Sequence, residues 1–167
     1  MGEVADIVNS GISVIKLVAN SAGVDVKETG YANGLPAGTK PDDLIGGDYK
    51  RVTKQWKQDT PWYEFYNVDF DFTVGMNWKW GLQIDGAHQM VDMVTVTLDV
   101  DYLPADQTVE VEAHFPGRGS REGTEDDVIA TLPFTIAVQM NYFLGQLVGW
   151  RKTLNCEVRG DGAWQMA

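Results

Sequence analysis

Cysteine is nearly absent from this sequence, which contains only Cys156 among its 167 residues. A single cysteine excludes an intrachain disulfide, and a lack of disulfides is typical of proteins made in the cytoplasm. Cys156 shares the parity of Leu154 and Val158 along an apolar alternation, so we expect its side chain to point inward. We therefore predict a buried, inert thiol.

Basic residues are also scarce, since 13 lysines and arginines stand against 24 acidic residues and give a net charge of −11. A surface this acidic repels phosphate backbones, which excludes nucleic acid as an expected partner. Docking on anionic lipid is disfavoured for the same reason, whereas recognition of a neutral headgroup is not.

Long apolar runs and targeting signals are missing too. No stretch reaches the ~18 uninterrupted apolar residues of a membrane-spanning helix. Glu3 and Asp6 occupy positions where a secretory signal carries basic residues. We expect a soluble protein made in the cytoplasm without a signal peptide, whose release from the cell would need an unconventional route or lysis.

The residues that most often carry catalysis are few and isolated. None of the four serines lies in a nucleophile-elbow context, and His88 and His114 have no cysteine or histidine at ligand spacing. The glycine-rich segment 117–123 lacks the lysine and the strand-to-helix context of a phosphate loop. We expect neither an enzyme nor a bound cofactor.

What the sequence does contain is a period-two alternation of apolar and polar residues. Four consecutive runs show it, over residues 68–74, 78–84, 94–102 and 109–115, with turn residues between them. Two further strands are expected over 129–140 and 147–158, where Pro133 indicates an edge position or a bulge. This pattern predicts a mostly β protein in which residues 49–167 form an antiparallel two-layer β-sandwich.

The first 22 residues instead predict an amphipathic α-helix, because apolar residues recur at three- and four-residue steps from Val4 to Ala22. Gly23 is a plausible C-cap, and residues 23–48 are predicted to be a Gly/Pro-rich connection. The helix is expected either to pack on the β domain or another copy, or to insert into a membrane. Its wide apolar face consists of Ile7, Val8, Ile12, Ile15, Leu17 and Val18.

Aromatic residues are concentrated between residues 56 and 80. Tyrosine and tryptophan combine an apolar ring with a polar tip, which suits a lipid headgroup at a membrane interface or stacking on a sugar. An aromatic core beneath the helix is an equally good interpretation. The candidates for headgroup or glycan binding are Trp56, Trp62, Tyr63, Tyr66, Trp78 and Trp80.

Pairs of acidic residues occur on single strand faces. Asp69 with Asp71, and Asp99 with Asp101, place two carboxylates ~7 Å apart, so aligned strands could bind Ca²⁺ or act on a sugar. A solvated, charged sheet face is the favoured interpretation, because Ca²⁺ sites usually draw on loop carbonyls as well. The tripeptide 159–161, Arg-Gly-Asp, is of the integrin-binding type, and a turn before a final strand is the favoured interpretation there.

Three of these parts together resemble actinoporin-type pore-forming proteins: the helix 4–22, the aromatic run 61–66, and the Arg-Gly-Asp tripeptide followed by Trp164. The resemblance covers about a quarter of the chain. It implies a β-sandwich that binds a phosphocholine headgroup and inserts its N-terminal helix. At ~1.5 Å per residue, a helix over 4–22 would reach about 28 Å, close to the ~30 Å of a bilayer core.

Three functions follow as hypotheses. The first is a membrane-lipid-binding, toxin-like protein that forms pores. The second is a structural subunit that self-assembles into a homo-oligomer, such as a particle coat or filament. The third is a lectin-like module that binds a glycan.

Overall fold

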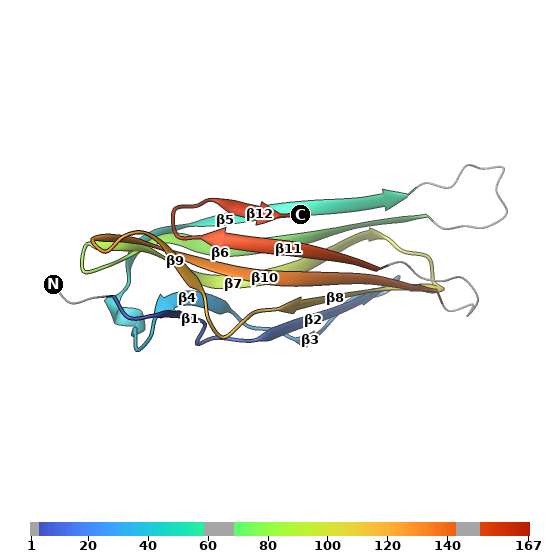
Figure 1. Cartoon of the computed structure of the whole chain (residues 1–167). Coiled ribbons are helices and arrows are strands. Elements are labelled where there is room, and N and C mark those ends of the chain that lie inside the picture. The colour runs from blue at the N-terminus through green and yellow to red at the C-terminus, as the bar shows by residue number, and fades with distance from the viewer. Residues whose placement is uncertain (1–3, 59–68, 143–150) are drawn as a thin grey trace.

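The structure is a computed structural model that describes residues 4–58, 69–142 and 151–167. Within these ranges the chain is almost entirely β, with strands that run along the long axis of an elongated molecule (Figure 1). One 3-10 helix, η1 (Pro41–Asp43), interrupts them. The strands are β1 (Ile7–Val8), β2 (Val14–Asn20), β3 (Gly23–Glu28), β4 (Ala32–Pro36), β5 (Ile45–Gln58), β6 (Phe70–Ile84), β7 (Ala87–Tyr102), β8 (Gln107–His114), β9 (Ser120–Thr124), β10 (Asp127–Tyr142), β11 (Arg151–Arg159) and β12 (Trp164–Met166).

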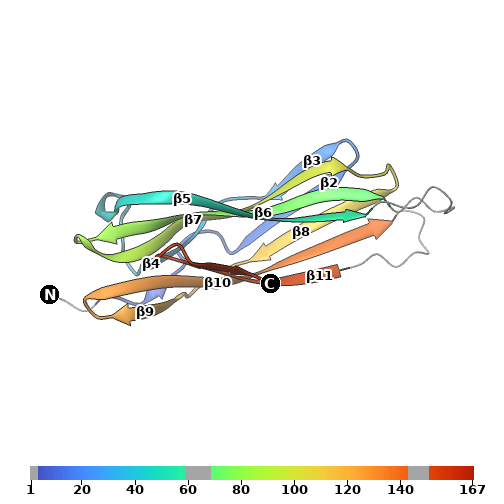
Figure 2. The same cartoon turned by 90° about the horizontal axis from the view of Figure 1, so that it is seen from above.

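Hydrogen bonds join these strands into one connected, curled sheet. One path runs β5-β6-β7-β10-β8-β2-β3, while β4 and β1 extend from β7, and β9, β11 and β12 extend from β10. All strand pairs are antiparallel except β7 with β10, which meet in parallel at Gln89 and Ile129. Seen from above, β5, β6 and β7 lie on one side, and β9, β10 and β11 on the other (Figure 2). The predicted antiparallel β class is confirmed, and the two-layer sandwich stays a prediction.

The core lies inside the curl and is built by the predicted alternations. On β8, Val109, Val111 and Ala113 are buried, and the residues between them are half-buried. On β7, Val94, Val96 and Leu98 are buried in the same way. Burying such a side chain contributes roughly 1.5–3 kcal/mol, so the alternation fixes which face of each strand turns inward.

The predicted N-terminal helix is wrong. Residues 4–22 contain β1 and β2, and Ile15, Leu17 and Ala19 on β2 are buried while the residues between them are half-exposed. Every second residue therefore faces the core, and β2 gains backbone partners on both sides, from β8 and β3. Valine and isoleucine, which dominate this segment, favour strands over helices because branching at Cβ restricts their rotamers in a helix.

The segment predicted as a connection, 23–48, is also structured. It contains β3, β4 and the first residues of β5. The polar stretch between β1 and β2 forms a turn in which Oδ1 of Asn9 accepts the backbone N–H groups of Gly11 and Asn33, each at 3.0 Å. Because the Asn9 side chain accepts these N–H groups, the backbone can turn here without the hydrogen bonds of a helix.

Candidate functional site

The described aromatic candidates lie in or against the core. Trp78 is fully buried, while Trp56 and Trp80 are partly buried and pack against the core. The Trp56 ring stacks on Phe72 with 5.5 Å between ring centroids. For these three tryptophans the aromatic-core interpretation is therefore the better one. The other three candidates, Trp62, Tyr63 and Tyr66, lie outside the described residues.

The acidic residues that were predicted to act in pairs have different partners and different exposure. Arg51 on β5 donates a hydrogen bond to Asp99 at 2.7 Å, and Gln55 donates one to Asp71 at 2.7 Å. Asp69 is half-buried and Asp101 is exposed. Among the residues that the structure describes, no group of three or more acidic, histidine or cysteine side chains could hold a metal ion. On the outer face of β5, β6 and β7, the basic residues Arg51 and Lys57 of β5 form ion pairs with Asp99 at 2.7 Å and with Asp71 at 3.9 Å.

The Arg-Gly-Asp tripeptide is part of the fold. Arg159 forms ion pairs with Glu122 at 2.6 Å and with Asp161 at 3.1 Å. Burial opposes ionisation of Asp161, but the Ala163 N–H and the Arg159 guanidinium outweigh it and lower the pKa of this carboxyl. Gly160 is buried, donates its N–H to the Ala130 carbonyl and accepts the N–H of Gly81, each at 2.8 Å. These contacts hold the tripeptide as a turn, which is the interpretation that its sequence favoured.

A cleft of about 670 Å³ opens at the end of the molecule that holds the β6–β7 turn. His88 in its wall adopts a left-handed backbone conformation (φ 61°), and its Nδ1 accepts the N–H of Val128 at 3.0 Å. The neutral ring therefore carries its proton on Nε2. The described lining supplies this imidazole, three exposed carboxylates and the Thr39 hydroxyl, which donates a hydrogen bond to the Pro36 carbonyl at 2.6 Å. The residues that define the cleft include Val4, Ile84, Asp85, His88, Glu125 and Asp126.

The two ends of the strand path are free edges with different chemistry. Within the described ranges β5 pairs only with β6, and it is exposed along most of its 14 residues. Lys50 and Lys54 lie opposite the buried Trp78 and Val74, so both lysines point to the core side. Lys50 donates to the Gly162 carbonyl at 3.0 Å, and the Lys54 ammonium lies 5.6 Å from the Trp56 ring. Inward-pointing lysines on an edge strand oppose the addition of another strand, because the added strand would bury their charges.

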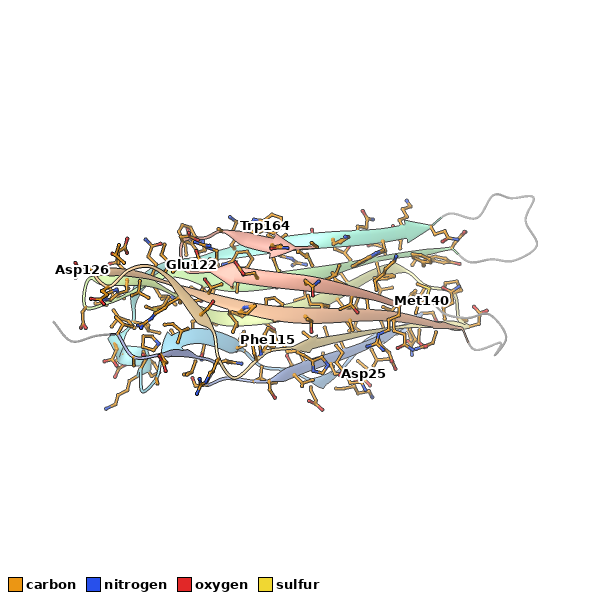
Figure 3. All side chains as sticks on the ribbon, viewed as in Figure 1. Asp25, Phe115, Glu122, Asp126, Met140 and Trp164 are labelled. Atoms are coloured by element: carbon orange, nitrogen blue, oxygen red, sulfur yellow. The ribbon has the colours of Figure 1, made fainter. Side chains whose placement is uncertain are left out.

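β3, at the other end of the path, carries no such lysine on its core side. Among the strands that the structure describes, it pairs only with β2, and all six of its residues are exposed. Val24 and Val26 lie opposite the buried Ala19 and Leu17, so they face the core side, yet they remain 40% and 51% exposed. Asp25 lies opposite the half-buried Val18 and forms an ion pair with Lys27, where the register of the β2–β3 pairing shifts by one residue. Figure 3 shows Asp25 at the edge of the molecule opposite to that of Trp164.

β3 is therefore the candidate functional site, and the sequence prediction missed it. The available signal was the alternation of Val24 and Val26 with Asp25 and Lys27, which lay inside the predicted connection. A strand edge with exposed valines and free backbone groups can accept another strand.

No family model, curated protein or solved structure matches this chain. None of the helices in the described ranges is long and apolar enough to cross a membrane. Of the parts that resemble actinoporins, the aromatic run 61–66 stays a prediction. The N-terminal helix is not present, because β1 and β2 occupy its residues.

Proposed function

We propose that this protein is a structural subunit that self-assembles through the edges of its sheet. One observation carries the proposal: β3 ends the strand path with an unpaired edge and two exposed valines on its core side. Monomeric proteins usually protect such an edge with a lysine, a proline, a bulge or a covering loop. β5 has inward lysines of this kind, whereas β3 has no lysine opposite its buried partners and carries only an irregularity at Lys27, near its end. The regular part of β3, residues 23–26, therefore supports association of copies.

The strongly acidic surface is consistent with this proposal. A net charge of −11 keeps the chain soluble and opposes unspecific clustering through self-repulsion. Association then requires a local surface where backbone hydrogen bonds and apolar contacts overcome the general repulsion. β3 supplies both, and Lys27 offsets one of its two acidic residues, Asp25 and Glu28.

Sedimentation velocity with light scattering over a wide concentration range tests the proposal. We expect the wild-type chain to shift from monomer to larger species as its concentration rises. Val26→Lys, which gives β3 the inward lysine that β5 already has, should remain monomeric. Ile45→Lys is the matched control, since Ile45 is a 64% exposed aliphatic residue at the start of β5 and its substitution should leave assembly unchanged. A wild-type chain that stays monomeric throughout would refute self-assembly.

Lipid-headgroup or glycan binding is the second candidate function. One described observation favours it, because the ring of Trp164 on β12 is 46% exposed and could stack on a sugar or enter a membrane interface. Membrane insertion by an N-terminal helix is no longer part of this candidate. Binding to zwitterionic liposomes and to a glycan array, with Trp164→Ala against Trp78→Phe as the core control, tests it. Absence of binding to every lipid and glycan by the wild type would reject it.

A further inference from the structure

We propose that His88 is a pH-sensitive switch at the junction of β7 and β10. Its neutral ring holds Val128 of β10, and protonation releases this bond and turns the ring toward the carboxylates of the neighbouring cleft. The inference goes beyond the self-assembly proposed above and does not depend on it, because none of the residues involved belongs to β3.

The junction itself consists of little backbone pairing. Within the described ranges, β7 and β10 meet in parallel at one pair of residues, Gln89 and Ile129. His88 and Val128 directly precede this pair, and the Val128 N–H donates to Nδ1 of His88 at 3.0 Å. Val128 is only 3% exposed, so its N–H has little access to water. The bond made by the imidazole is therefore an important part of the contact between the two strands.

The backbone of β7 directs the ring toward β10. Leu82 pairs with Met90, and Ile84 pairs with Ala87. Two residues of β7 therefore lie opposite one residue of β6, which makes a β-bulge that contains His88. His88 takes a φ of 61° there, a left-handed conformation that few residues other than glycine and asparagine adopt readily. Bulges of this kind redirect a side chain, and here the imidazole is directed across the junction.

Protonation changes the hydrogen bonds that this ring can make. A neutral imidazole has one acceptor nitrogen, whereas an imidazolium carries N–H groups on both nitrogens and accepts nothing. The Val128 N–H would then face another donor and lose its partner. Histidine side chains commonly change charge between pH 5 and 8. We therefore expect the bond to be present at pH 7.5 and lost near pH 5.

The cleft offers the protonated ring new partners. Asp85 in the β6–β7 turn, and Glu125 and Asp126 in the β9–β10 turn, line the cleft together with His88. All three carboxylates are exposed, and Figure 3 shows Asp126 at this end of the molecule. Negative charges near an imidazole stabilise its protonated form. A ring that loses Val128 can therefore turn toward these carboxylates.

The remaining charges near the junction do not reverse this balance. Asp127 directly precedes Val128 and is exposed, so it adds a further negative charge. On β9, Glu122 forms an ion pair with Arg159 at 2.6 Å, and Arg121 donates to a backbone carbonyl at 2.8 Å. Lys40 is exposed beside the cleft residue Thr39. The rest of the described lining contributes no titratable side chain.

Hydrogen exchange of the Val128 amide, measured by NMR on the full chain, tests the switch. Its protection factor, which corrects for the intrinsic pH dependence of exchange, should fall about tenfold between pH 7.5 and pH 5. The amide of Ile136, in the part of β10 that pairs with β8 and β11, is the reference and should change by less than about twofold. Nitrogen NMR of the ring should show Nδ1 without a proton at pH 7.5 and with one at pH 5.

His88→Asn separates the switch from other effects of acid. The asparagine Oδ1 occupies the same place along the side chain as the histidine Nδ1, accepts a hydrogen bond at any pH, and tolerates the left-handed backbone. Val128 should therefore stay protected at pH 5 in this variant. His114→Asn is the matched control, because it removes the other of the two histidines and should leave the wild-type response intact.

Each contrary result would overturn the switch. Wild-type protection of Val128 that does not change with pH would show that protonation leaves the junction intact. An equal fall in His88→Asn, or the loss of the response in His114→Asn, would assign the effect of acid to another group. If His88→Asn fails to fold, the wild-type ring decides, since a proton on Nδ1 at pH 7.5 is incompatible with the bond to Val128.

Discussion

A Cβ atom on Gly160 would lie 2.0 Å from the carbonyl oxygen of Gln89. Gly160 follows β11 and Gln89 belongs to β7, so this contact brings together strands from the two sides of the curled sheet. Gln89 is also the residue through which β7 meets β10 in parallel, opposite Ile129. The backbone hydrogen bonds of Gly160 to Ala130 and Gly81 fix its position from both sides. Only a residue without a side chain fits there.

Gly160→Ala should therefore destabilise the fold by about 3 kcal/mol or more, because the added methyl group meets a backbone atom that cannot rotate away. Urea unfolding measures this loss. Gly117→Ala is the control, since an added Cβ at Gly117 meets no atom within 4 Å and stability should change by less than ~0.5 kcal/mol. Equal stabilities of the two variants would contradict the close approach.

The strands after residue 68 could be predicted because their apolar residues recur at every second position, which fits a strand and not a helix. Val94, Val96 and Leu98 fit a strand and no helix. Residues 14–20 fit two periods. Val14, Ile15, Leu17 and Val18 can form one face of a helix, or the segment can be a strand with Val14 and Val18 on its outer side. The pairing of β2 with β8, nearly a hundred residues later, decided between them. The local sequence of residues 14–20 does not show the stabilisation that a strand gains from pairing with a distant segment.

Asp161 should stabilise the fold at neutral pH and lose this effect in acid. Its folded-state pKa is lowered, so its contribution is fully present above the ordinary value near 3.8 and disappears as the pH falls through the lower folded value. We expect Asp161→Asn to reduce the free energy of unfolding by about 1 kcal/mol at pH 7. The difference from wild type should shrink as the pH falls below the ordinary value of 3.8.

Urea titrations at both pH values measure this effect. Asp101→Asn is a suitable control, because Asp101 is an exposed aspartate on β7. Its substitution should change stability by less than ~0.5 kcal/mol at either pH. A constant difference between wild type and Asp161→Asn from pH 7 down to acid would show that the Arg159 contact does not depend on the charge of Asp161.

Cys156 should be unreactive in the native protein, as its inward parity predicted. Burial raises the pKa of its thiol to about 12, while the nearby Lys54 ammonium acts in the opposite direction. The thiolate is the reactive form, so a disulfide-exchange reagent at pH 8 should modify the unfolded chain quickly and the native chain only through unfolding. Rapid stoichiometric modification of the native chain would contradict burial.

The same raised pKa predicts a loss of stability in base. The folded thiol keeps its proton between the ordinary value of 9.0 and about 12, whereas the unfolded thiol loses it. The unfolded state then binds fewer protons, so stability falls as the pH rises through this range, by up to ~1.4 kcal/mol per pH unit. Cys156→Ala should make this part of the pH profile less steep.

The candidate site was harder to predict than the strands. The sequence does not distinguish the ring of Trp78 from an exposed ring that could stack on a ligand, and only its complete burial in the folded chain shows that it belongs to the core. The β3 edge was missed for a related reason. Val24 and Val26 have the alternation of a strand, but their exposure depends on β3 being the last strand of its path in the described part of the chain. The sequence of β3 therefore does not show whether another strand lies beside it.

Trp78 gives a last prediction, because its indole nitrogen is buried without a hydrogen-bond partner. Trp78→Phe removes this unsatisfied N–H together with part of the ring, so the gain from losing a buried unpaired donor should offset part of the cavity cost. We expect a loss of about 1 kcal/mol for Trp78→Phe and ~3–5 kcal/mol for Trp78→Ala, measured by urea unfolding. A Trp78→Phe loss as large as that of Trp78→Ala would mean that the N–H forms a hydrogen bond in solution. Because the ring is fully buried, Trp78→Phe should also leave any lipid or glycan binding unchanged.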